Sequence, residues 1–112
     1  MELSIRRVII FTRRMEEMAE FYRDVIGLKQ LTDEADWKEF QAGGCNLALH
    51  KGASTVGSRP PKLVFYSSDV AATRSELLRR GASLGKVKSG NGPDLCDGHD
   101  PDGNPFQISN RS

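Results

Sequence analysis

Hydrophobic positions in the first half of the chain follow two different periods. Residues 5–11 are rich in β-branched and aromatic side chains, which predicts a strand, and alternation puts Arg7, Ile9 and Phe11 on one of its faces. After Thr12, a candidate N-cap, apolar side chains recur at helical spacing, which predicts a helix that ends at Gly27. Shorter strands are predicted over residues 28–32, 37–41 and 45–50.

The same order of elements returns in the second half of the chain. Residues 63–66 predict a strand, and Asp69 is placed to cap a helix that Gly81 ends. Further strands are predicted over residues 84–87, 94–98 and 105–109. Gly27 and Gly81 stand at matching points of the two halves. The pattern therefore indicates two copies of one unit, each with a strand, a helix and two or three further strands.

A segment of linker composition joins the two copies. Residues 51–61 contain two glycines, two serines, a threonine and the pair Pro60-Pro61. We therefore predict a first module over residues 1–52, a linker over 53–61 and a second module over 62–112. A module of about fifty residues buries little apolar surface alone, so we expect both to share one core in a single α+β domain.

Composition narrows the function only by exclusion. The chain has 112 residues and a formal net charge of +1, which gives no case for nucleic acid or an anionic membrane as partner. No apolar stretch is long enough to span a bilayer, and residues 8–11 are too short for a signal-peptide core, so a cytoplasmic protein is expected. Cys45 and Cys96 lie in no metal-binding spacing and are expected to be free thiols.

Three short phrases, in this order and spacing, resemble the vicinal oxygen chelate superfamily of glyoxalases, bleomycin-resistance proteins and extradiol dioxygenases. They are FYRDVIGL at residues 21–28, SDV at 68–70 leading to RGA at 80–82, and DPDGN at 100–104 before the final strand. The resemblance implies two βαβββ modules that form a cupped mixed sheet around a shared cavity. It also implies a homodimer, with the modules either swapped or packed side by side.

In metal-dependent members of that superfamily, the first and last strands of each module supply the ligands. By this resemblance the four positions fall on Arg7, Ala48 (with His50 as the nearest alternative), Lys62 and Gln107. Arginine and lysine have no lone pair to give a metal at neutral pH, and alanine has no donor atom. We therefore predict no metal and no other cofactor.

The same strand faces point to the cavity in this superfamily, so the substituted residues are candidates for ligand binding. The predicted ligand-binding residues are Arg7, Phe11, Trp37, His50, Lys62, Tyr66 and Gln107. Cationic and hydrogen-bonding side chains among them favour a small anionic or polar-aromatic molecule. Trp37 is placed to offer a stacking face at the rim.

Other interpretations of these residues stay open at the level of sequence. Arg7 and Lys62 also fit solvated strand ends, and His50 also fits a structural histidine. His50 is the one candidate for a general base, which keeps a lyase, isomerase or dioxygenase of the same superfamily as the alternative function. A regulatory or structural module with a filled cavity is a third possibility.

Overall fold

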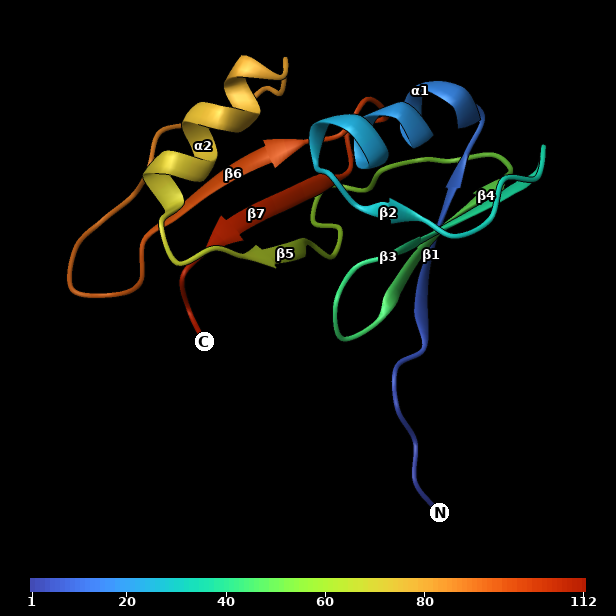
Figure 1. Cartoon of the computed structure of the whole chain (residues 1–112), viewed down its shortest axis with the longest axis horizontal. Helices are drawn as coiled ribbons and strands as arrows, with labels where there is room; N and C mark the ends of the chain where they lie inside the picture. Colours follow the sequence, from blue (N-terminus) through green and yellow to red (C-terminus); the bar gives the residue numbers. More distant parts are fainter. The chain divides into compact units, whose positions relative to one another are not determined.

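The computed structural model describes all 112 residues and divides them into two compact units, Met1–Thr55 and Val56–Ser112 (Figure 1). Each unit has its own sheet and its own helix. Between Lys51 and Leu63 the backbone forms neither helix nor strand. No helix in the structure is both long and apolar enough to cross a membrane.

The first unit is built on a mixed four-stranded sheet in the order β1-β4-β3-β2. Strand β1 (Arg7–Thr12) lies parallel to β4 (Asn46–Lys51), and β3 (Trp37–Gln41) runs antiparallel to β4. The two-residue β2 (Lys29–Gln30) pairs with β3 at the edge. The central strand β4 thus connects the first strand of the unit to its third.

The helix of this unit changes its winding part-way along. It begins as α1 (Met15–Glu20) and continues as a π-helical turn, η1 (Phe21–Val25), in which Ile26 N–H donates to the Phe21 carbonyl at 2.9 Å. The helical stripe supplies Met18 and Tyr22, which are both fully buried. They share the core of the unit with apolar side chains from the strands, namely Phe40, Leu47 and Leu49.

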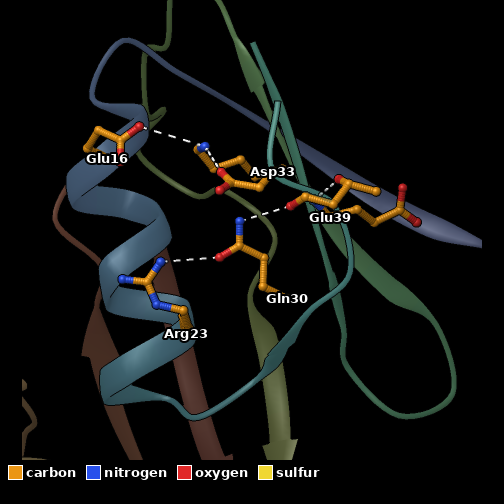
Figure 2. Close-up of polar contacts among 7 residues, drawn as sticks. Glu16, Arg23, Gln30, Asp33 and Glu39 are labelled. Carbon is orange, nitrogen blue, oxygen red and sulfur yellow. Dashed lines mark hydrogen bonds and ion pairs between the residues drawn. The ribbon is translucent and has the colours of Figure 1, made fainter. Parts of the chain in front are cut away.

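Polar side chains tie this helix to the chain around β2 and β3 (Figure 2). The Lys38 ammonium, whose side chain is 6% exposed, bonds to Asp33 and lies 3.7 Å from a carboxylate oxygen of Glu16. Seven residues after Glu16, Arg23 donates to the Gln30 side-chain oxygen at 3.2 Å. The hydrogen bond that Lys38 donates to Asp33 raises the pKa of Lys38 against the effect of burial, so this cation on β3 stays charged.

The second unit repeats the arrangement with a three-stranded sheet in the order β5-β7-β6. Strand β5 (Leu63–Tyr66) is parallel to β7 (Pro105–Ser109), and β6 (Leu95–His99) is antiparallel to β7. Helix α2 (Val70–Arg79) lies along β6 and β7 (Figure 1). The buried apolar side chains of this unit include Val70, Leu77, Cys96, Phe106 and Ile108.

Both predicted helix stops are confirmed. Gly27 has a φ of 89° and Gly81 a φ of 98°, the left-handed conformation that glycine adopts without a steric penalty. Just past these glycines, Leu28 N–H bonds back to the Tyr22 carbonyl and Ala82 N–H to the Leu77 carbonyl, both at 2.9 Å. The predicted cap of α2 is also confirmed, since the Asp69 carboxylate accepts from Ala72 N–H at 3.0 Å.

Two local predictions are wrong. Residues 84–87 form no regular strand, because only isolated bridges join Leu84 to Gly98 and Lys88 to Leu95. These bridges differ in register by one residue, so an extra residue interrupts the ladder. Thr12 is not the N-cap of α1, because the helix begins after Arg14 and the Thr12 hydroxyl instead accepts from Arg14 N–H.

The predicted α+β class is confirmed by these two units. Each unit has a mixed sheet, one helical segment and the chain order strand, helix, strands, and neither sheet closes into a barrel. In the second unit the second strand of the expected βαβββ order is reduced to the two bridges.

Candidate functional site

A row of exposed and half-buried aromatic rings crosses the sheet of the first unit. Phe11 lies opposite His50 on the neighbouring strand, and Trp37 lies opposite His50 on its other side. The ring centroids are 5.4 Å apart for Phe11 and His50 and 5.5 Å apart for Trp37 and His50. Alternation along β4 puts this row on the face opposite the buried Leu47 and Leu49. Phe11 remains 48% exposed there, so the row presents a ring surface to solvent.

A buried carboxylate lies on the same face, two positions along the strands. Glu39 is 7% exposed, and one of its oxygens accepts from Asn46 Nδ2 at 2.8 Å and from Arg7 Nε at 3.1 Å. The hydrogen bond from Asn46, helped by Arg7, holds the pKa of Glu39 below its usual value despite burial. The Arg7 guanidinium also lies 5.9 Å from the centre of the Trp37 ring. Arg7 is therefore a neutralised cation that connects the carboxylate to the aromatic row.

The second unit carries a related arrangement on its sheet. Asp97 accepts from Gln107 Nε2 at 3.0 Å and from Lys62 Nζ at 3.1 Å. Burial acts to raise the pKa of Asp97, but the bonds from Gln107 and Lys62 hold it below its usual value. Val64 and Tyr66 flank this group and are 58% and 65% exposed.

The two carboxylates occupy equivalent places in the repeat. Glu39 lies opposite Ala48 on the last strand of its unit, and Asp97 lies opposite Gln107 on the last strand of the other. The cations Arg7 and Lys62 each stand near the start of the first strand. Each copy of the unit thus holds one cation–carboxylate pair on its sheet. The residue types differ, since the pair is Arg7 with Glu39 in the first unit and Lys62 with Asp97 in the second.

The structure brings most of the predicted residues together within each unit. Arg7, Phe11, Trp37 and His50 lie on one face of the first sheet, while Lys62 and Gln107 meet at Asp97 in the second unit. Tyr66 lies one row away, opposite Ser109.

Sequence reasoning missed the two carboxylates, Glu39 and Asp97, and the amide of Asn46. A signal for the carboxylates was available, because both stand in the strand before the last one of their copy, between two neighbours that are buried.

The sequence matches one known protein family over most of its length. A family model for the glyoxalase-like domain matches residues 7–109. The chain belongs to the glyoxalase-like domain family. This membership confirms the superfamily that the sequence phrases resemble. Among curated proteins, no sequence match is found.

Solved structures agree with this glyoxalase-like fold. TnmS3, an antibiotic binding protein from Streptomyces sp. CB03234, superposes with a TM-score of 0.78 at 22% identity, over 100% of this chain and 99% of that one. A lactoylglutathione lyase from Agrobacterium tumefaciens gives a TM-score of 0.75 at 20% identity, over 95% of this chain and 92% of that one. At these identities the likeness shows the fold alone.

The metal that enzymes of this superfamily use does not fit the side chains at the corresponding positions. Arg7 and Lys62 are each bonded to a carboxylate, and a guanidinium or ammonium offers no lone pair. Ala48 has no donor atom, so the Gln107 amide is the one side chain at these four positions that could bind a metal. Nowhere in the chain do three or more His, Cys, Asp or Glu side chains gather in an arrangement that could hold a metal ion.

Proposed function

We propose that this glyoxalase-like chain binds a small molecule on its exposed sheet faces rather than catalysing metal-dependent chemistry. The observation that carries the proposal is the row of Phe11, His50 and Trp37, which offers tilted and edge-on ring surfaces beside a buried, ionised carboxylate. Exposed aromatic rings next to fixed polar groups are typical of small-molecule sites. On the sheet of the second unit, taken by itself, Lys62, Tyr66 and Gln107 are the proposed ligand contacts.

Of the two ligand classes expected from the sequence, the contacts favour a polar-aromatic molecule. Arg7 and Lys62 would attract an anion if their charges were free, but each cation has a carboxylate partner at 3.1 Å. The net charge of each pair is close to zero, so the attraction for an anion is weak. A planar ring, in contrast, gains contact with Phe11, His50 and Trp37 whatever its charge.

The likeness to TnmS3, which is described as an antibiotic binding protein, supports a binding role without supplying a ligand. The alternative of a lyase, isomerase or dioxygenase requires either metal ligands or an oriented general base. The His50 imidazole makes no hydrogen bond within the chain, so no side chain orients it for proton transfer.

Fluorescence of Trp37, the only tryptophan, provides the test. Titration of the full chain with planar quinones and flavonols should quench this fluorescence and saturate. Phe11→Ala should raise the dissociation constant about tenfold or more, because a stacked aromatic contact is worth roughly 1 kcal/mol in addition to its buried area. Leu78→Ala, which removes an exposed apolar side chain from α2, is the matched control.

Two results would reject this proposal. One is an equal loss of affinity in Phe11→Ala and Leu78→Ala. The other is a divalent metal present at one equivalent per chain in protein purified without chelators, together with lyase or dioxygenase activity that a chelator abolishes.

A further inference from the structure

A cavity of about 540 Å³ lies in the second unit, at the end of the sheet where β5 and β7 begin and β6 ends. Its walls come from the segment before β5 and from the turn between β6 and β7. The lining residues are Val56, Gly57, Ser58, Arg59, Pro60, Lys62, His99, Gly103 and Pro105. A volume of this size is within the range of about 300–1,000 Å³ that small organic ligands occupy.

Three basic side chains from separate segments converge on this cavity, namely Arg59, Lys62 and His99. Lys62 shares its charge with Asp97. The side chains of Arg59 and His99, in contrast, make no hydrogen bond or ion pair with any part of the chain. The guanidinium of Arg59 therefore keeps all of its donors for a ligand, and it presents them in a fork that matches an oxyanion.

The acidic groups near the cavity are already engaged. Asp97 is bonded to Lys62 and Gln107. Asp100, which is buried in the turn, accepts from the Asn104 side chain and from the backbone N–H groups of Asp102 and Asn104. The donors to Asp100 are neutral and leave its charge in place, but neither carboxylate bonds to Arg59. The guanidinium of Arg59 is therefore free to attract an anion at the cavity.

Backbone and apolar atoms complete the lining. The amide N–H groups of Gly57 and Ser58 have no acceptor within the chain, and they lie beside Arg59 in the sequence. Val56, Pro60 and Pro105 supply apolar walls. The cavity thus combines a basic, donor-rich part with surface on which an apolar body can pack.

We propose that this cavity is a second binding site, which takes a small organic oxyanion with an apolar body, either a carboxylate or a phosphate monoester. Arg59 holds the charged end in a two-pronged contact, and His99 donates one further hydrogen bond. This site shares no residue with the aromatic row of the first unit, so one site can fail without the other.

The test is an NMR titration of the full ¹⁵N-labelled chain with phenyl phosphate, with benzoate and with neutral phenol. Either anion should give saturable amide shifts centred on residues 57–59, 62, 99 and 103, and phenol should not. The two anions distinguish a phosphate from a carboxylate site. Arg59→Ala should raise the dissociation constant about tenfold, because it removes the charged donor. His99→Asn should raise it by a smaller factor, because the shorter asparagine still carries a neutral N–H donor.

Arg111→Ala provides the matched control, because Arg111 is an exposed arginine that follows the far end of β7. Equal weakening by Arg59→Ala and Arg111→Ala would show that only general surface charge is involved and would overturn the proposal. Absence of saturation with both anions, or equal binding of phenol, would also overturn it. Quenching of Trp37 by aromatic probes should be unchanged in Arg59→Ala.

Discussion

Glu39 shows how one residue gives the exposed sheet face its polar character. Its carboxylate has a lowered pKa because Asn46 and Arg7 bond to the ionised form. Since the folded pKa is below the unfolded one, the stabilisation is fully present above the ordinary pKa of glutamate. It is lost as the pH falls through the folded pKa.

We therefore expect Glu39→Gln to reduce the loss of stability on acidification. Melting temperatures measured from pH 7 down to pH 3 should fall less steeply in the variant than in the unmodified chain. Glu2→Gln, at an exposed terminal carboxylate, should leave the slope unchanged. Parallel curves for Glu39→Gln and the unmodified chain would contradict this role of the ion pair.

Sequence alone could predict which residues share a face but not which charges pair. Alternation correctly put Arg7 with Phe11, and the placement of His50 followed from the same rule. The partners of the two cations could not be found in this way, because pairing depends on the register between strands that are distant in sequence. Arg7 and Glu39, for example, are 32 residues apart.

Gly98 stands at a position where the surrounding atoms leave no room for a side chain. A Cβ atom at this position would lie 2.6 Å from Phe106 Cζ, 2.7 Å from Leu84 Cδ2 and 2.8 Å from the Ser83 carbonyl oxygen. We expect Gly98→Ala to lower the free energy of unfolding by about 1–3 kcal/mol, as overpacking does in other cores. Chemical denaturation provides the measurement. Gly90→Ala, which meets nothing within 4 Å, is the control and should change stability little.

At the scale of elements, the sequence succeeded where the local signal and the final packing agree. The strands over residues 37–41, 63–66 and 105–109 have the predicted bounds. The expected strand over 84–87 is absent because its register slips by one residue against β6, and a hydrophobic pattern carries no information on such a slip. The π-helical turn η1 was missed for a similar reason, since an inserted residue preserves an approximate apolar stripe.

Helix α2 is capped by the Asp69 carboxylate, which accepts a hydrogen bond from Ala72 N–H. Asp69→Ala should destabilise the chain by about 1 kcal/mol, because it leaves a helix N–H without its acceptor. Ser68→Ala is the control, since the neighbouring serine makes no side-chain hydrogen bond. Urea unfolding of both variants measures the effect. Equal stability of the two variants would show that the cap does not contribute.

At the scale of the whole molecule, the two units provide a test of whether the chain is one domain. Residues 1–55 are too few to bury a large apolar core, so we expect this piece alone to lack a cooperative thermal transition. Mixing it with residues 56–112 should restore one. Circular dichroism during heating checks both expectations. Separate, cooperative melting of residues 1–55 would show instead that the units are independent domains.

Exposed apolar side chains on the second sheet lead to a prediction about assembly. Val64 and Tyr66 are 58% and 65% exposed on neighbouring positions of one face, which presents apolar surface to a partner. We propose that a second copy covers this face in a homodimer. Light scattering after gel filtration should then give twice the chain mass. Val64→Asp should shift the measured mass toward that of the monomer, because a buried charge without a partner opposes association. Leu78→Asp adds the same charge at a 39% exposed position on α2 and should leave the dimer intact. A monomer at all concentrations, or equal dissociation by both variants, would reject this face as the interface.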